Sequence, residues 1–293
     1  MQIPVILNPA ARSMRAASLE QVIRGLSPTP EVHLTQGPED AERLAFELAG
    51  RGYPLVAAAG GDGTVNQAIH GLARYNATVS DPTRHTALGI LPVGTMNVLA
   101  HELKIPARDL EAAWARVVSG ERREIDLWCA NEFFFAQLGG VGLDAQIVEA
   151  TTPDMKNRFG PLSYAISAVG VLSQEAPLLT VHLENKPPMF GSILLVGNGK
   201  HYGGPVPVFP DARNDDGLLD LILFHQRGPW EIMQFLHAVA MGDFSNCGDI
   251  DYLQAKEVRV ESQTAVPFEV DGELAKTTPV VIKAAPFKLK VAM

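Results

Sequence analysis

One stretch of the chain combines glycine, acidic and hydroxyl residues in a pattern suited to phosphate binding. Gly60-Gly61-Asp62-Gly63-Thr64-Val65-Asn66 follows an apolar run and leads directly into a helical pattern. Glycine lets backbone N–H groups approach a ligand closely, and the first turn of a helix adds N–H groups and a partial positive charge. Asp62 would repel a bare phosphate, so its presence favours phosphate accompanied by a cation. The competing interpretation is a tight strand–helix turn with Asp62 or Thr64 as the helix cap.

A second turn repeats this logic one apolar run later. Pro92-Val93-Gly94-Thr95-Met96-Asn97 again ends an apolar run with glycine and threonine. The Thr95 hydroxyl could donate a hydrogen bond to phosphate, and Asn97 could hold a ligand or the loop. An ordinary loop with Thr95 as a cap explains the same residues. The first turn is neither GxGxxG nor GxxxxGK[ST], which excludes a dinucleotide fingerprint and a P-loop.

Two acidic residues near the end of the sequence could accept a proton. Phosphoryl transfer to a hydroxyl needs positioning, charge neutralisation and a group that takes the hydroxyl proton. Asp271 and Glu273 flank Gly272 between two apolar runs, and a carboxylate of ordinary pKa is already ionised at neutral pH. The same residues also read as a plain hairpin with an Asp-Gly turn, so both interpretations stay open at this point.

Alternating patterns in the first part of the chain predict elements that position these residues. Continuous apolar runs predict strands at Ile3–Leu7, Glu31–Thr35, Pro54–Ala59 and Ala87–Leu91. Helical patterns are found at Pro38–Gly50, Thr64–Arg74 and Asp109–Ser119. This alternation predicts a parallel sheet with right-handed crossovers, whose ligands lie at the carboxyl ends of the strands. Those ends carry Asn8, Thr35 and the two glycine turns.

The pattern changes after about residue 124. Short apolar runs split by turn residues, such as Ile125–Ala130, Phe133–Leu138 and Val266–Val270, predict an antiparallel sandwich or barrel. Helical patterns interrupt them at Leu162–Leu172 and Trp230–Met241. We therefore expect two domains, residues 1–123 and 124–293, with the last strand free to return to the first domain.

Composition limits the classes of partner. The 293 residues include 24 Lys and Arg against 33 Asp and Glu, a net charge of −9. Such a chain does not suit nonspecific nucleic-acid binding, and it has no long-range attraction to an anionic lipid surface. Cys129 and Cys247 lack the spacing of a zinc cluster. No apolar stretch approaches the ~20 residues of a membrane helix, and no signal-peptide pattern is seen. We expect a cytoplasmic protein.

Taken together, the motifs resemble the diacylglycerol kinase catalytic family, which includes bacterial lipid kinases and the related sphingosine and ceramide kinases. Besides the two turns, the match includes Gly140–Ala145, Pro210–Asp220 and Asp271–Glu273, in an order that covers nearly the whole chain. The resemblance implies an α/β plus all-β fold. An N-terminal Rossmann-like, NAD-kinase-like nucleotide-binding domain precedes a C-terminal β-sandwich domain, and the active site lies in the cleft between them.

The resemblance also implies a reaction and the residues that perform it. The reaction is ATP-dependent phosphorylation of a hydroxyl of diacylglycerol or a related lipid. Glu273 is the favoured general base, Asp271 is second, and Asp62 supports Mg–ATP and the geometry of the site. The Asp216 carboxylate and the carbonyl groups of Arg213 and Leu218 are the implied Mg²⁺ ligands. The implied ATP contacts are Asn8, Pro9, Ala10, Ala11, Arg12, Thr35, Gly60, Gly61, Asp62, Gly63, Thr64, Val65, Asn66, Gly94, Thr95 and Asn97.

One position departs from the family pattern, and alternatives remain. Family members often carry an acidic residue after the asparagine of the second turn, where this chain has Val98. Asp144 either contacts the lipid head group or is a polar surface residue. The leading hypothesis is a lipid kinase that docks transiently on the inner membrane surface, and a homodimer is allowed. A kinase related to NAD kinase or phosphofructokinase is the second hypothesis, because these enzymes also use a Gly-Gly-Asp-Gly turn. A nucleotide-sensing regulator without turnover is the third.

Overall fold

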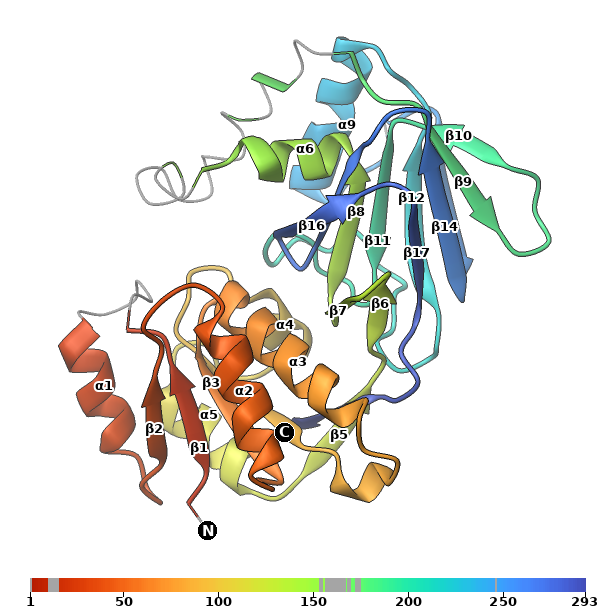
Figure 1. Ribbon diagram of the computed structural model, residues 1–293. Coiled ribbons are helices and arrows are strands. Elements are labelled where there is room, and N and C mark those ends of the chain that lie inside the picture. Colours follow the sequence, from red (N-terminus) through yellow and green to blue (C-terminus); the bar gives the residue numbers. More distant parts are fainter. Residues whose placement is uncertain are drawn as a thin grey trace.

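The computed structural model describes residues 2–9, 16–152, 155, 167, 170–171, 175–245 and 247–293. The predicted ATP contacts Ala10, Ala11 and Arg12 lie outside these residues, as does most of the predicted helix Leu162–Leu172. Figure 1 shows an α/β unit below and a β-sandwich unit above, with the C-terminal strand in the lower unit. The predicted fold class is confirmed.

The lower unit is built on a mostly parallel sheet in the order β2-β1-β3-β4-β18-β5. Its strands are β1 (Pro4–Leu7), β2 (Glu31–Leu34), β3 (Leu55–Gly60), β4 (Ala87–Pro92), β5 (Arg122–Ile125) and β18 (Leu289–Ala292). Every residue of β1, β3 and β4 is buried, because helices cover both faces of the sheet, and this explains their continuous apolar sequences. The edge strand β5 runs antiparallel to β18.

Helices cover this sheet on both faces. They are α1 (Ala16–Arg24), α2 (Asp40–Gly50), α3 (Asp62–Asn76), α4 (Val98–Glu102) and α5 (Leu110–Val118), with a short 3-10 helix, η1 (Pro82–Arg84). α2 and α3 lie together in front of the sheet in Figure 1, and α5 lies behind it. A Cβ on Gly71 of α3 would lie 2.2 Å from the Glu42 carbonyl oxygen, so glycine is what lets α2 and α3 pack closely.

The upper unit is a sandwich of two antiparallel sheets. The first has the order β10-β9-β14-β17-β6-β7, and the second β13-β12-β11-β8-β15-β16. Side chains such as Leu221, Val260 and Phe268 form an apolar core between them. Helices α6 (Leu143–Ala150) and α9 (Pro229–Met241) form a further apolar cluster with residues of the second sheet. The strands are β6 (Trp128–Ala130), β7 (Phe133–Phe135), β8 (Leu138–Gly142), β9 (Leu179–Leu183), β10 (Met189–Gly191), β11 (Ile193–Gly197), β12 (Leu219–Phe224), β13 (Ile250–Ala255), β14 (Glu257–Ser262), β15 (Pro267–Val270), β16 (Glu273–Thr277) and β17 (Val280–Ala284).

The chain crosses between the units at Asp126 and Leu127. The prediction of one strand over Ile125–Ala130 is wrong, because β5 ends at Ile125 and β6 begins at Trp128 in another sheet. Asp126 interrupts the run: its N–H donates to the Asn214 carbonyl oxygen at 2.7 Å, and its Oδ1 pairs with Lys288 Nζ at 2.8 Å. The expected domain boundary at 123/124 therefore falls inside β5. The chain returns to the lower sheet between β17 and β18.

The predicted strand Phe133–Leu138 is also divided, between β7 and β8. No helix in the described part of the chain is both long enough and apolar enough to cross a bilayer.

Candidate active site

The carboxyl ends of the central strands meet beside β1 and β3. The chain passes from β1 outward to β2 and then returns to β3 on the other side of β1, which makes this point the switch point of the sheet. The N–H of Asn8 donates to the Ala59 carbonyl oxygen, and the N–H of Thr35 donates to that of Leu7, each at 3.0 Å. These bonds hold the predicted strand-end residues side by side.

A cavity of about 440 Å³ opens at these strand ends. Five of the predicted ATP contacts line it: Asn8, Pro9, Thr35, Gly63 and Thr64. Asn8 Nδ2 donates to Thr64 Oγ1 at 3.1 Å, which joins the end of β1 to the start of α3. Five further lining residues were not predicted: Gln36, Gly37, Pro38, Ala41 and Gln67. They follow Thr35 or Thr64 closely in sequence, so a wider window around each predicted strand end would have included most of them.

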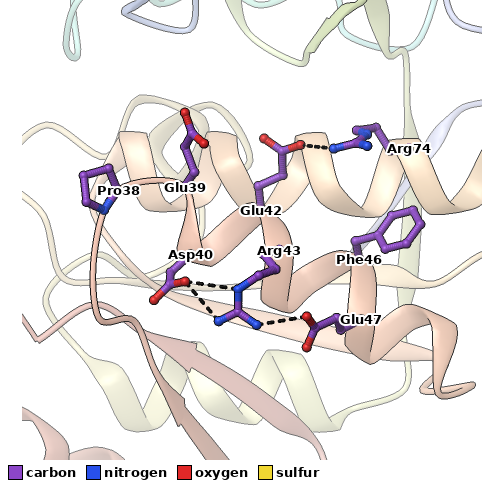
Figure 2. Close-up of a pocket in the computed structure, with 8 residues that line it drawn as sticks. All are labelled: Pro38, Glu39, Asp40, Glu42, Arg43, Phe46, Glu47 and Arg74. Carbon is purple, nitrogen blue, oxygen red and sulfur yellow. Dashed lines mark hydrogen bonds and ion pairs between the residues drawn. The ribbon is translucent and has the colours of Figure 1, made fainter.

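A larger hollow of about 560 Å³ lies on the outer side of α2. Figure 2 shows that its two arginines point to acidic neighbours: Arg43 to Asp40 and Glu47, at 3.0 and 2.9 Å, and Arg74 to Glu42 at 2.6 Å. Exposed pairs of this kind contribute little energy. We interpret the hollow as a surface ion-pair network and place the candidate site at the strand ends.

The glycine turn leaves the start of α3 available to an anion. α3 begins at Asp62 with Gly61, a residue without a side chain, as its N-cap, so the competing interpretation with Asp62 or Thr64 as the helix cap is wrong. A Cβ on Gly60 would lie 2.3 Å from Thr64 Cβ, and a Cβ on Gly94 would lie 2.3 Å from Gly61 Cα. The two predicted turns therefore pack backbone against backbone. The N–H groups in the first turn of α3 lie beside the cavity and suit a phosphate group.

Asp62 joins the two turns to each other. Its Oδ1 accepts the N–H of Val98 at 2.6 Å, and its Oδ2 accepts the N–H of Asn97 at 2.9 Å, so Asp62 caps α4 instead of α3. The Asn97 side chain in turn accepts from and donates to the backbone of Gly94, at 3.0 and 2.8 Å. Burial raises the pKa of Asp62, and the two N–H bonds oppose that rise. Val98 contributes its backbone N–H where family members often have an acidic side chain.

Three other predicted contacts lie around this turn. Val65 and Asn66 are buried in the first turns of α3, and Val65 packs in the core of the lower unit. The Asn66 Oδ1 atom is buried and has no hydrogen-bond partner among the described residues. Thr95 is exposed.

Asp271 fixes the turn between β15 and β16. Asp271 and Gly272 have φ of 48° and 81°, a left-handed conformation that suits a tight hairpin, so the predicted hairpin is confirmed. The Asp271 carboxylate accepts the N–H groups of Ala136, Gln137 and Leu138, at 3.1, 3.0 and 2.9 Å. Burial raises its pKa to about 6, against the lowering effect of these bonds. Asp271 thus anchors the turn to the start of β8.

Glu273 reaches from the sandwich to the glycine turn of the other unit. It is the first residue of β16 and is half-buried. A Cβ built on Gly63 would lie only 2.9 Å from Glu273 Oε1, so the carboxylate lies against the first turn of α3. A negative charge is favourable there. The predicted base and the predicted phosphate turn, far apart in sequence, are brought together.

The predicted metal loop is held in a tight turn. Asp216 Oδ1 accepts the N–H of Leu218 at 3.0 Å, and Gly217, with φ of 74°, donates its N–H to Asp126 Oδ2 at 2.6 Å. Arg213 lies in the same loop. Among the described residues no cluster of three or more His, Cys, Asp or Glu side chains is arranged for a metal ion. The predicted site has one carboxylate and two carbonyl ligands, so this finding does not test it.

A contact that sequence reasoning missed joins the units behind α4. Glu102, the last residue of α4, accepts the N–H groups of Lys200 and His201 at 2.9 and 3.2 Å, and its Oε2 lies 2.6 Å from His201 Nδ1. No motif marks Glu102, because its partners belong to a loop of the other unit. α4 is thus held by Asp62 at one end and by the sandwich at the other.

Comparisons with known proteins point to one family over nearly the whole chain. Residues 2–130 match the family model described as diacylglycerol kinase catalytic domain, and residues 139–293 match YegS C-terminal NAD kinase beta sandwich-like domain. A diacylglycerol kinase of Bacillus subtilis is 30% identical over 94% of this chain and 90% of its own length. The "Probable lipid kinase YegS-like" of Chromohalobacter salexigens is 33% identical over 83% of this chain and 76% of its own length. The crystal structure of a diacylglycerol kinase from Bacillus anthracis aligns with a TM-score of 0.77 at 22% identity, covering 99% of this chain and 96% of that one, which supports the fold.

Proposed function

The chain belongs to the diacylglycerol kinase family of lipid kinases, and on that premise we propose that it transfers the terminal phosphoryl group of ATP to a hydroxyl of diacylglycerol or a related lipid. The contact between Glu273 and Gly63 carries this proposal. It brings a carboxylate to the place where an acceptor hydroxyl must lie if the first turn of α3 holds the phosphates. Transfer of this kind depends mainly on positioning and on charge stabilisation.

ATP would occupy the cavity at the strand ends. Its phosphates would contact the first turn of α3, and Asn8 and Thr35 line the same cavity. The predicted contacts at residues 10–12 remain part of this proposal. The two turns pack against each other at Gly60, Gly61 and Gly94, and Asn97 hydrogen-bonds to Gly94. We therefore propose that these residues set the shape of the site and make few direct contacts with the nucleotide.

The contacts of the three acidic candidates support different roles for them. Asp62 accepts two N–H groups and Asp271 accepts three, so both carboxylates are used in holding backbone. Glu273 lies beside the phosphate turn and projects from the unit expected to bind the lipid. We therefore assign Glu273 as the general base, with Asp271 and Asp62 as residues that position the site.

Magnesium would have two roles in this proposal. Bound with ATP, it neutralises phosphate charge during transfer. At the Asp216 loop, the second Asp216 oxygen and the carbonyl groups of Arg213 and Leu218 offer oxygen ligands, which Mg²⁺ prefers. That loop contacts Asp126 at the crossing between the units, so an ion there would stabilise the arrangement of the units.

A lipid acceptor requires contact between the protein and a membrane. Because ATP is cytoplasmic and diacylglycerol-like lipids reside in bilayers, we propose transient contact with the inner membrane surface. The net charge of −9 requires this contact to be local and not electrostatic over long range.

A transfer assay tests the proposal. ATP labelled in its terminal phosphate is offered with Mg²⁺ to a panel of diacylglycerol, sphingosine, ceramide and monoacylglycerol in mixed micelles, and with NAD and fructose 6-phosphate. We expect label in a lipid phosphate. Label in NAD or the sugar phosphate would favour the second hypothesis, and ATP binding with no transfer would favour a nucleotide sensor.

Variants of two glutamates sharpen this assay. Glu273→Gln should lower kcat by ~10²-fold or more with ATP affinity nearly unchanged. Glu257→Gln, an exposed residue of β14, is the matched control and should behave like the wild type. Equal losses of kcat and ATP affinity in Glu273→Gln would contradict the base assignment.

A further inference from the structure

A buried group of polar side chains lies directly behind the turn that carries Glu273. Glu269 of β15 is 2% exposed and Tyr202 is 8% exposed. The Tyr202 hydroxyl lies 2.8 Å from Asp144 Oδ2 and 3.2 Å from Glu269 Oε1. Asp144 of α6, expected either to contact a head group or to face solvent, is half-buried and belongs to this group. The three residues come from distant parts of the chain, so the sequence did not indicate that they lie together.

The two carboxyl groups meet over a glycine. A Cβ on Gly140 of β8 would lie 2.1 Å from Asp144 Oδ2 and 3.0 Å from Glu269 Oε1, so the absence of a side chain there makes room for both groups. The Tyr202 hydroxyl lies within hydrogen-bond distance of both carboxyl groups, but it has a single hydrogen and can donate to only one of them. It can accept from the other only if that group carries a proton, so all three side chains are hydrogen-bonded when the two carboxyl groups hold one proton between them.

Glu269 also holds the turn itself. Its Oε2 accepts the N–H of Gly272 at 2.7 Å, and Gly272 immediately precedes Glu273. On the other side, the Asp271 carboxylate holds the turn to the N–H groups of residues 136–138. The direction in which Glu273 leaves the turn is therefore set by the carboxyl groups of Glu269 and Asp271, of which only Glu269 shares a hydroxyl partner with a second carboxyl group.

We propose that Glu269, sharing one proton with Asp144, is a positioning residue for phosphoryl transfer: it holds Gly272 so that the Glu273 carboxylate faces Gly63. This inference rests on the proposed function, since it takes Glu273 as the general base. Glu269 itself is buried and does not touch the cavity at the strand ends.

The protonation of the pair gives the proposal a pH signature. The titratable groups that face Glu269 are Asp144 from α6, Tyr202 from its loop and Asp271 from the turn, while the nearby part of β8 has only glycine and aliphatic residues. Burial raises the pKa of Glu269 well above its ordinary value and also raises the pKa of Asp144. The pair therefore keeps its proton to a higher pH than an ordinary carboxyl group does, and loses it as the pH rises further. Two adjacent negative charges then separate, and the turn loses its fixed position.

Two variants test separately the hydrogen bond from Gly272 to Glu269 and the proton that Glu269 shares with Asp144. In Glu269→Gln, the side-chain oxygen can still accept from Gly272, and the amide can donate to the Tyr202 hydroxyl, which donates to ionised Asp144. We expect kcat near the wild-type value at pH 7 and a weaker fall in kcat at alkaline pH. Glu269→Leu fills a similar volume but leaves the Gly272 N–H without its acceptor. We expect its kcat to fall by ~10- to 100-fold with the KM for ATP nearly unchanged. Glu257→Leu on β14 is the control and should keep full activity.

An NMR measurement reports the geometry without relying on activity. Labelling aspartate carbonyl carbons with ¹³C and glycine nitrogens with ¹⁵N selects the Asp-Gly pairs, which in this chain give signals for Gly63, Gly217 and Gly272. In Glu269→Leu we expect the Gly272 and Gly63 signals to move and the Gly217 signal to stay. If Glu269→Leu fails to fold, the Gly217 signal moves too, and the alkaline profile of Glu269→Gln then decides.

Three results would overturn the inference: full kcat in Glu269→Leu, an unmoved Gly63 signal in that variant, or an unchanged alkaline fall in Glu269→Gln. A full kcat in Glu273→Gln would instead overturn the proposed role of Glu273, so the two failures are distinguishable.

Discussion

Replacing Gly63 with alanine tests the contact on which the site depends. The new Cβ would lie 2.9 Å from Glu273 Oε1, closer than a carbon and an oxygen can approach. The side chain of Glu273 has to move by about 0.5–1 Å to restore a van der Waals distance. A displacement of that size at a reacting group costs up to ~10²-fold in rate. We therefore expect kcat to fall by about 10- to 100-fold.

The same substitution should not harm the fold. Gly63 lies in the first turn of α3, where alanine is the better helix former by up to about 1 kcal/mol. We expect Tm to stay the same or to rise by about 2 °C. Lower activity in a protein of equal or greater stability separates a site effect from unfolding. The measurements are steady-state lipid phosphorylation, thermal unfolding and ATP binding by calorimetry.

Two controls decide whether Gly63→Ala acts through Glu273. Gly248→Ala adds a Cβ with no atom within 4 Å and should leave activity unchanged. In a Glu273→Gln background, Gly63→Ala should cost little more, because the group that it displaces no longer takes the proton. Wild-type kcat in Gly63→Ala, or a loss confined to ATP affinity, would refute the reasoning: the alanine would then be harmless or would obstruct only the phosphates.

Further predictions concern the residues that hold the site together. The pKa of Asp271 is raised to about 6, so its carboxylate gains a proton as the pH falls through that value and then accepts the three N–H groups less well. In a pH–rate profile, kcat/KM should therefore fall below about pH 6. Asp271→Asn should remove this fall. Asp62→Asn replaces a carboxylate that accepts two N–H groups of α4, and urea denaturation should show a loss of about 1–3 kcal/mol in the free energy of unfolding. Glu102→Ala leaves the N–H groups of Lys200 and His201 without their acceptor, so it should cost about 2 kcal/mol and speed limited proteolysis of that loop.

The bounds of a strand can be predicted closely from the sequence where the strand is buried on both faces. β3 and β4 were predicted within one residue at each end, because strands covered on both faces are continuously apolar and end at glycine or proline. Asp126 shows where this logic fails. The apolar run around it looks like one strand, but the buried carboxylate pairs with Lys288, and the chain changes sheet there. The partner that decides the break lies far along the sequence.

The site shows the same division. The glycines at 60, 61, 63 and 94 can be identified from the sequence because a tight turn restricts the residue type at each of these positions. The role of Asp62 was not predictable, since capping α4 depends on how two turns pack. Glu269 and Tyr202 left no pattern at all, because their contacts form only when α6, β8 and β15 come together. The sequence pattern therefore predicts which residues lie at the proposed phosphate site, whereas the contacts of those residues depend on tertiary packing.

A continuous series of contacts connects the glycine turn at residues 60–63 to the turn that carries Glu273, the proposed general base. Asp62 holds the start of α4, and Glu102 at its end holds the loop at 200–201. The next residue of that loop, Tyr202, bonds to the pair that holds Gly272, and Glu273 then returns to Gly63. The series closes on itself through both units. A change in the position of α4 on nucleotide binding would therefore reach the proposed general base by bonded contacts as well as through its direct contact with Gly63, and this is why Glu102 should influence the reaction.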